Sequence, residues 1–223
     1  AEKAAASPTE KLHVRADRLM YDHLRDYVAA ERAKQECNYA EAGKRMEHMM
    51  ALKAELNTIS PYFGWHPFPV YQEKWEQERM QNINTRVAGT NETLLMPMPL
   101  EAKFKTDPKK EGEAAGWGGP KLDDQAWLTI RTSTGWQNQG LVDAQGKPLM
   151  DEHGHPYVGT AWYRFDGVSI PDSAKGRSVW LFCPALVNQA WVYVNGEAAG
   201  ERKYMQPWFR PQELEVEISK FIR

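Results

Sequence analysis

The spacing of apolar residues changes once along this chain, near residue 60, and that change limits the folds the chain can adopt. Before it, apolar residues recur every three or four positions, the period of an amphipathic helix. From residue 93 onward the spacing falls towards two and turn residues become frequent, which is typical of short strands. Between them, SPYFGWHPFPVY (60–71) is too proline-rich for a helix interior. The sequence therefore predicts an α+β protein, with helices first and strands after them.

Two helices are expected within residues 7–58. Ser7-Pro8-Thr9-Glu10 is a capping box with proline at the first helical position, and Asn38-Tyr39-Ala40-Glu41 repeats the capping signature. Apolar or half-apolar residues of the first helix are expected to form one stripe on one face: Leu12, Ala16, Leu19, Met20, His23, Leu24, Tyr27 and Val28. The second helix continues the spacing with Ala42, Met46, Met49, Met50, Lys53 and Leu56. We expect an antiparallel helical hairpin over residues 1–60, with its methionines packed in the core.

The rest of the chain is expected to hold a connecting segment and a sheet region. Residues 61–92 form the connection, with a short helix from Glu73 to Asn84. Strands are expected at residues 93–98, 101–105, 126–131, 160–165, 179–183, 190–194 and 214–218. Because no helix intervenes between them, these strands predict an antiparallel β-sandwich over residues 93–223.

Composition and charge exclude several classes of protein. A hydrophobic content of 42% in 223 residues allows one substantial core or two modest ones. The net charge of −2 comes from dispersed acids and bases, so there is no basic stripe for nucleic acid. No apolar run approaches the roughly 20 residues needed to cross a bilayer. Ala1 fits either a processed secreted protein or a fragment. Cys37 and Cys183 are expected to be buried free thiols.

Two adjacent segments in the longest loop match each other. DAQGKPLM (143–150) and DEHGHPYV (151–158) share Asp, Gly and Pro at an offset of eight residues. Each is expected to form an Asp-initiated turn, so the pair predicts looped hairpins and not a binding repeat. His153 and His155 could ligate a metal, but we expect both to be solvated turn residues and predict no metal site.

The stretch WVYVNGEAAG (191–200) predicts a hairpin whose strand is apolar on both faces. Asn195-Gly196 supplies the two positive φ angles of a type I′ turn. Successive side chains alternate, so Trp191 and Tyr193 share one face and three small apolar residues share the other. A solvated face should be polar. We therefore expect packing to cover Trp180, Trp191 and Tyr193, and an open sugar platform is the alternative.

Six blocks in this order resemble the sugar-binding, jelly-roll domain of glycoside hydrolase family 2. They are FKTDPKKEGEAAGW (104–117), LDDQAWLTI (122–130), GWQNQG (135–140), GTAWYRFDGVSIP (159–171), SVWLFCPALVNQAWVYVNGEAAG (178–200) and WFRPQELEVEISKFI (208–222). The resemblance covers residues 93–223 and implies a galactose-binding-like jelly roll. The helices before it resemble, more faintly, a helical region that follows the catalytic barrel in some large glycosidase-like proteins.

The resemblance also implies partners. Domains of this kind usually continue beyond ISKFIR with a turn and a final apolar strand, and here the chain stops at Arg223. Either the chain is truncated, or the sandwich lacks its last strand because a catalytic domain or another chain supplies it. Such modules bind oligosaccharide or polysaccharide, and by analogy the protein would be secreted or periplasmic. They sometimes carry structural calcium, although no ligand set can be assigned here and no other cofactor is expected.

Sugar contacts are expected on loops at one end of the sandwich. Pyranose rings present an apolar face and fixed hydroxyls, so their sites need a flat aromatic ring beside amide or carboxylate groups. The residues that meet this requirement are Trp117, Trp136, Asn138, Gln139, Tyr204 and Trp208. Trp136 and Trp208 could instead plug the ends of the sandwich.

No catalytic pair is expected in this chain. Glycoside hydrolysis needs two rigidly held carboxyl groups about 5–10 Å apart across the scissile bond. Asp123-Asp124 and Asp151-Glu152 are adjacent in turns, where neighbouring side chains point apart. The sequence predicts a non-catalytic accessory region of a carbohydrate-active enzyme. One alternative is part of an active glycosidase whose carboxylates lie on another chain or domain, and another is a structural or assembly module without a ligand.

Overall fold

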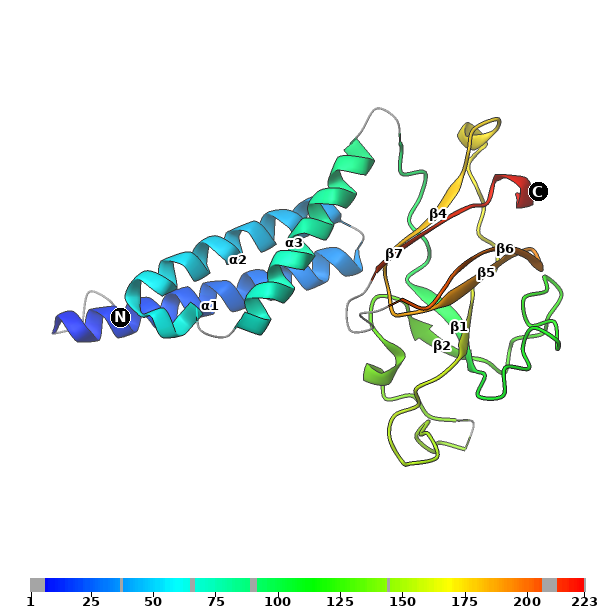
Figure 1. The fold of residues 1–223 in the computed structure, drawn as a ribbon, viewed down its shortest axis with the longest axis horizontal. Coiled ribbons are helices and arrows are strands. Elements are labelled where there is room, and N and C mark those ends of the chain that lie inside the picture. Colours follow the sequence, from blue (N-terminus) through cyan, green and yellow to red (C-terminus); the bar gives the residue numbers. More distant parts are fainter. Residues whose placement is uncertain are drawn as a thin grey trace. The chain divides into compact units, whose positions relative to one another are not determined.

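The computed structural model describes residues 7–36, 38–64, 67–88, 92–143, 145–205 and 212–222. The chain divides into two compact units, Ala1–Leu94 and Leu95–Arg223. In Figure 1 the first unit carries the long helices and the second carries the strands. The sheets are antiparallel, so the protein is α+β, as the change in apolar spacing predicts.

The first unit contains α1 (Pro8–Gln35), α2 (Tyr39–Ile59), the 3₁₀ turn η2 (Pro61–Gly64) and α3 (Pro67–Ala88). Figure 1 shows α1 and α2 side by side as a hairpin. An ion pair of 2.7 Å joins Arg15 near the start of α1 to Glu55 near the end of α2, as an antiparallel pair requires. Part of the core between these helices is formed by Ala16, Leu19, Leu52 and Leu56.

The predicted capping residues start both hairpin helices. The Ser7 hydroxyl accepts a hydrogen bond from the Glu10 backbone N–H at 3.2 Å, and the Glu10 carboxylate accepts from the Ser7 N–H at 2.8 Å. At the start of α2, the Asn38 side-chain oxygen accepts from the Glu41 N–H at 3.2 Å. Each bond satisfies a backbone donor that has no partner within the helix. The capping predictions are confirmed.

The apolar residues of α1 do not form the single stripe that the sequence predicted. Ala16 and Leu19 are buried, whereas Met20, Leu24 and Val28 are exposed. Residues 16, 19 and 23 lie on one side of the helix, and residues 20, 24 and 28 lie about 100° further round it. The apolar spacing in the sequence predicted the helix correctly. It did not separate the two apolar faces, because residues on both faces recur every three or four positions.

A buried carboxylate joins the two hairpin helices. Asp26 on α1 is 0% exposed and accepts hydrogen bonds from Arg45 at 2.9 Å and from His48 at 2.6 Å. Burial raises the pKa of Asp26, but the hydrogen bonds and charges of His48 and Arg45 lower it by more, so the net pKa is below its usual value. The methionine prediction is confirmed at Met46 and Met49, which are buried.

The third helix begins earlier than the short helix that the sequence predicted. It starts at Pro67, not at Glu73, and ends at Ala88. Proline is tolerated in the first turn of a helix, where its missing N–H has no intrahelical acceptor. The proline-rich stretch therefore contains the start of α3 and is not wholly irregular. Met80 and Ile83 on this helix are buried.

The second unit is built from short antiparallel strands. They are β1 (Glu101–Thr106), β2 (Leu128–Arg131), β3 (Ala161–Arg164), β4 (Trp180–Leu186), β5 (Ala190–Val194), β6 (Glu197–Arg202) and β7 (Gln212–Glu217). They pair as a three-stranded sheet, β2-β1-β3, and as two-stranded sheets β4-β7 and β5-β6. The strand expected at residues 93–98 is absent from the described structure there. Pro97 and Pro99 lack the N–H groups that a paired strand would donate.

The β5–β6 hairpin has the turn that the sequence predicted. Asn195 has φ 53° and Gly196 has φ 88°, the two positive angles of a type I′ turn. The Asn195 amide also donates to the Phe221 carbonyl at 2.8 Å. A Cβ atom at Gly196 would lie 3.2 Å from Pro120, so the turn packs closely against the loop after β1. This contact positions the aromatic residues on β5.

The two matching loop segments also form the predicted turns. The Asp143 carboxylate accepts from the backbone N–H groups of Gln145 and Lys147, both at 2.9 Å. The Asp151 carboxylate accepts in the same way from His153 at 2.8 Å and from His155 at 2.9 Å. Both segments therefore form the Asp-initiated turns that the sequence predicted.

Disulfides and membrane-spanning helices were both considered in the sequence, and the described residues bear on each. Cys183 is half-buried and forms no disulfide within the described residues, and Cys37 lies outside those residues. None of the helices within the described ranges combines the length and the apolar character needed to span a membrane.

Candidate functional site

One face of the three-stranded sheet is covered by the long loop between β1 and β2. Residues in register on neighbouring strands share a face, so Lys103 and Lys105 on β1 lie on the same face as Arg164 and Trp162 on β3. The opposite face carries Phe104, which is buried. Residues 107–127 therefore pack against the charged face of this sheet.

Asp107 fixes the start of this loop. Its carboxylate is buried and accepts hydrogen bonds from the Glu111 and Gly112 N–H groups at 2.9 and 3.0 Å, and from the Trp162 indole at 2.9 Å. Burial raises the pKa of Asp107, but these bonds and the Lys105 charge lower it by more. Asp107 is therefore ionised at neutral pH and holds the Trp162 ring in place.

Arg164 fixes the end of the loop. Its buried guanidinium donates to Asp124 at 2.9 Å, to Asp166 at 3.1 Å, and to the carbonyls of Trp117 at 2.6 Å and Gly119 at 3.0 Å. A guanidinium has five donors in a fixed fork, so this arrangement occupies most of them. The residue is a structural clamp, and its bonds leave it no capacity to bind a ligand through several donors.

Aromatic rings of this loop and of β3 pack against one another. Trp117 contacts Trp127 at 5.5 Å between centroids and Trp162 at 6.2 Å, both edge to face. Trp162 in turn lies 5.3 Å from Tyr193 on β5, and the Lys105 ammonium lies 3.9 Å above the Trp117 ring. These distances are favourable for aromatic and cation–π contacts.

The ring contacts continue from Trp162 to β5, whose aromatic residues lie near the surface. Tyr193 is half-buried and follows Trp191 by two residues, so both rings leave the same face of the strand. Trp191 is 45% exposed, and its partner across the hairpin is Glu201. We call Trp162, Tyr193 and Trp191 the aromatic row. Burial and a hydrogen bond to exposed Glu113 raise the pKa of Tyr193.

The prediction that packing covers the strand aromatics holds for only one of three residues in the described structure. Tyr193 is held between Trp162 and the backbone at Gly118, where a Cβ atom would lie 3.3 Å from the tyrosine. Trp180 on β4 is 53% exposed and Trp191 on β5 is 45% exposed. The exposure of Trp191 fits the alternative that the sequence allowed, an open sugar platform, and sugar binding there stays a prediction.

The residues predicted from the sequence to contact sugar are dispersed. Trp117 is buried beneath Lys105, Tyr204 is exposed after β6, and Trp208 lies outside the described residues. The other predicted contacts, Trp136, Asn138 and Gln139, form the short 3₁₀ turn η3 (Trp136–Asn138) and the residue after it. The structure therefore does not bring the predicted contacts together, and sugar binding at them stays a prediction.

The polar groups of η3 are mostly used internally. The Trp136 indole donates to the Tyr157 carbonyl at 2.8 Å, and its ring lies 5.6 Å from Phe104. The Gln139 amide bonds both the N–H and the carbonyl of Arg131, each at 2.9 Å. Asn138 is exposed. Trp136 thus closes one side of the core, which is the plugging role that the sequence left open.

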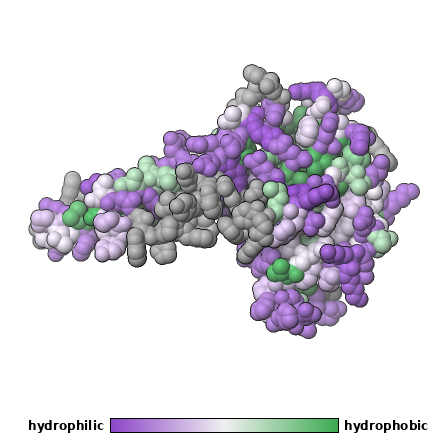
Figure 2. All heavy atoms as spheres, viewed as in Figure 1, coloured by the Kyte–Doolittle hydropathy of each residue, from purple (hydrophilic) through white to green (hydrophobic). Residues whose placement is uncertain are grey.

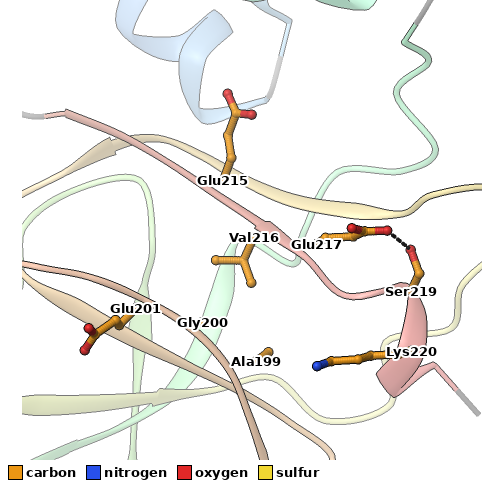
Figure 3. Close-up of a pocket in the computed structure, with 8 residues that line it drawn as sticks. All are labelled: Ala199, Gly200, Glu201, Glu215, Val216, Glu217, Ser219 and Lys220. Carbon is orange, nitrogen blue, oxygen red and sulfur yellow. Dashed lines mark hydrogen bonds between the residues drawn. The ribbon is translucent and has the colours of Figure 1, made fainter.

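A shallow groove of about 440 Å³ lies between β6 and β7. It is lined by Ala199, Gly200, Glu201, Glu215, Val216, Glu217, Ser219 and Lys220. Figure 3 shows Glu215 and Glu201 pointing away from its centre, Glu217 bonded to Ser219 at 3.0 Å, and Lys220 lying along it. Its carboxylates do not converge on a common point, so the groove lacks the arrangement that glycoside hydrolysis requires.

The other acidic groups that the sequence raised are also engaged elsewhere. Asp124 is bound by Arg164, and burial raises its pKa less than Arg164 and Asp166 lower it. Backbone bonds from His155 and His153 lower the pKa of Asp151. No group of three or more His, Cys, Asp or Glu side chains within the described residues is placed to hold a metal ion.

Sequence reasoning missed Asp107 and Arg164, which organise the loop and the aromatic row. Asp107 precedes a proline and looks like an ordinary turn residue, and Arg164 lies within a predicted strand. The Arg164 guanidinium lies 5.9 Å from the Trp127 ring. The available signal was an arginine inside a strand between aromatic residues, since a buried arginine needs several acceptors.

Similarity to known proteins is found among solved structures. No family model and no curated protein matches the chain. Among solved structures, Ruminococcus gnavus β-glucuronidase is 17% identical with a TM-score of 0.42, and its complex with uronic deoxynojirimycin is 19% identical with a TM-score of 0.43. Each match covers 55% of this chain and 18% of the other chain. Because the TM-scores lie below 0.5, neither fold nor activity follows from these similarities.

Proposed function

We propose that the second unit is a non-catalytic carbohydrate-recognition module of a glycoside hydrolase-related protein. The observation that carries the proposal is the aromatic row, which leads from a rigid interior to an exposed indole at Trp191. Glu201 lies opposite Trp191 in the hairpin. The apolar face of a pyranose ring stacks on such an indole, while its hydroxyl groups donate to a carboxylate.

Buried groups support the strand that carries Trp191. Asp107 orients Trp162, and Trp162 packs against Tyr193. These contacts hold β5 in place, and a binding surface on a pre-organised strand loses less conformational freedom when a ligand binds, which favours affinity. The type I′ turn fixes the other end of β5 against Pro120.

We further propose that the unit is a jelly-roll sandwich of the galactose-binding type. Gly200 on β6 lies so close to Val216 on β7 that a Cβ atom would come within 2.8 Å of the valine side chain. This contact supports β5-β6 and β4-β7 as neighbouring layers. A catalytic domain or another chain would supply the strand that completes this sandwich. A polysaccharide ligand would imply that the protein is secreted or periplasmic.

Calorimetric titration of the 223-residue chain against a panel of polysaccharides and their oligosaccharides tests the proposal. We expect saturable binding that Trp191→Ala weakens about threefold to tenfold, since an aromatic contact contributes about 0.5–1.5 kcal/mol. Trp180→Ala is the matched control, because Trp180 has similar exposure and lies on another strand. It should leave the affinity unchanged.

The outcomes separate the possible functions. No binding across the panel by a chain with a native circular dichroism spectrum refutes carbohydrate recognition and favours a structural module. Binding that Trp180→Ala weakens and Trp191→Ala does not would place the ligand on the outer face of β4-β7. Turnover of any oligosaccharide by the chain alone would show that the unit is not purely accessory.

A further inference from the structure

Helix α1 carries an apolar stripe that the described residues leave exposed. We define the apolar stripe as Met20, Tyr21, Leu24, Tyr27 and Val28. Their exposed fractions run from 44% to 66%, and Leu24 at the centre is 58% exposed. In Figure 2 hydrophobic atoms are visible among hydrophilic ones on the helical unit. The spacing of four, three and one residues places these side chains on one side of the helix.

The apolar stripe is separate from the face that packs against α2. That face is formed by small and apolar residues such as Ala16, Leu19, Ala30 and Ala33, all of them buried. A helix with one apolar face needs one partner, and α1 has two such faces. The hairpin with α2 satisfies only the first of them.

A row of arginines borders the apolar stripe. Arg18, Arg25 and Arg32 follow one another at intervals of seven residues, about 10.5 Å along the helix, and therefore lie along one edge. Asp22 is shared by two of them, at 2.9 Å from Arg25 and 3.8 Å from Arg18. The edge therefore carries more positive than negative charge.

We propose that the apolar stripe binds an amphipathic α-helix that has aspartate or glutamate at seven-residue intervals beside its own apolar residues. Apolar side chains would pack against Met20, Leu24 and Val28, and the carboxylates would face the arginine row. This arrangement is that of two packed helices whose edge charges choose the partner. The partner is a helix of another chain or domain, and this assembly role is independent of carbohydrate binding by the second unit.

The charges argue against a second copy of α1 as the partner. Asp17 and Glu31 lie seven residues before and after Leu24, so they continue its line along the helix. A parallel, in-register pair of copies would place each of these carboxylates against itself. An antiparallel pair would place the arginine row of one copy against that of the other. Either arrangement brings like charges together, whereas a partner whose carboxylates lie only along the arginine edge does not.

Two designed helical peptides of 21 residues test the proposal. Both carry leucine at the packing positions, and one has glutamate along the edge where the other has lysine. Fluorescence anisotropy with the full 223-residue chain should show binding of the glutamate peptide and at least tenfold weaker binding of the lysine peptide. Raising the salt concentration should reduce the difference, because the charges are exposed.

Variants identify the surface involved. Leu24→Asp should weaken binding of the glutamate peptide at least tenfold, since the contact buries an apolar side chain. Tyr62→Ser is the control, because Tyr62 is 80% exposed on η2 and lies outside the apolar stripe. Changing all three residues of the arginine row to glutamate should reverse the preference, so that the lysine peptide binds better than the glutamate peptide. The substitutions are Arg18→Glu, Arg25→Glu and Arg32→Glu.

Two results would overturn the proposal. Equal binding of the two peptides, or binding of neither, would show that the arginine row does not select an acidic helix. Dimerisation of the chain in sedimentation experiments, abolished by Leu24→Asp, would identify a second copy as the partner in spite of the charges.

Discussion

The carboxylate of Asp26 is the buried charge of the helical hairpin, and removing it should destabilise the first unit. Asp26 is 0% exposed, whereas its partners Arg45 and His48 have side chains 39% and 54% exposed. After Asp26→Ala both partners can be hydrated, so no isolated charge is left buried. The expected loss is that of the charge-assisted hydrogen bonds alone, about 2–3 kcal/mol of the free energy of unfolding.

The pH dependence of this loss follows from the pKa of Asp26. Since the folded pKa is below the unfolded value, the ionised carboxylate stabilises the fold above about pH 4, and the stabilisation disappears as pH falls through the folded pKa. The difference in unfolding free energy between the natural chain and Asp26→Asn should therefore be largest near neutral pH. It should shrink steadily below pH 4.

Guanidinium unfolding followed by circular dichroism at 222 nm measures this difference, because that signal comes mainly from the helices. Asp22→Ala on the same helix is the control, since its ion pairs involve exposed arginines and should contribute less than about 1 kcal/mol. A loss below about 0.5 kcal/mol for Asp26→Ala, or a difference that does not change between pH 7 and pH 3, would refute the reasoning.

Three further predictions concern the second unit. Arg164→Met should lower the free energy of unfolding by about 3–5 kcal/mol, because it breaks a buried charge network; unchanged tryptophan fluorescence and stability would contradict this. Gly196→Ala should destabilise more than Gly176→Ala in thermal unfolding. Both glycines have positive φ, but of the two only Gly196 has atoms within 4 Å of an added Cβ, those of residues 118–120; equal losses would refute the role of this contact. Burial raises the pKa of Tyr163 to about 12, so its folded form loses stability as pH rises above about 10, and Tyr163→Phe should resist alkaline unfolding, measured by circular dichroism, better than the natural chain.

Local signals identified the helix starts and the hairpin turn correctly. The capping box at Ser7, the side-chain cap at Asn38 and the turn at Asn195-Gly196 depend on atoms within a few residues, so their pattern in the sequence is sufficient. The expected strands at residues 190–194 and 101–105 correspond to β5 and β1 for the same reason. A two-residue period with β-branched or aromatic residues already specifies an extended segment.

Elements without a strong local pattern were missed or misjudged. β6 consists of EAAGER, which combines small residues with charges, and becomes a strand because β5 provides its hydrogen-bonding partner. The first turn of α3 contains Pro67 and Pro69, and their sequence resembles a loop. In both cases the surrounding structure outweighs weak intrinsic preference.

The candidate site depended on long-range packing far more than the fold class did. Any of the tryptophans could have been a sugar contact by composition, since each offers the same flat ring. Burial of Trp117 beneath Lys105 follows from how residues 107–127 fold over the sheet, whereas Trp191 stays exposed on β5. That fold is fixed by Arg164, whose acceptors lie up to 47 residues away in the sequence.

The sequence by itself determined that helices precede strands, where the helices begin, and how β5 turns into β6. These features follow from backbone geometry and from hydrogen bonds between near neighbours. Only the tertiary structure decided that α1 has two apolar faces, because a period of 3–4 residues fits either face equally well. It also decided which aromatic rings remain accessible to a ligand, because solvent exposure depends on segments that are distant in the chain and adjacent in space.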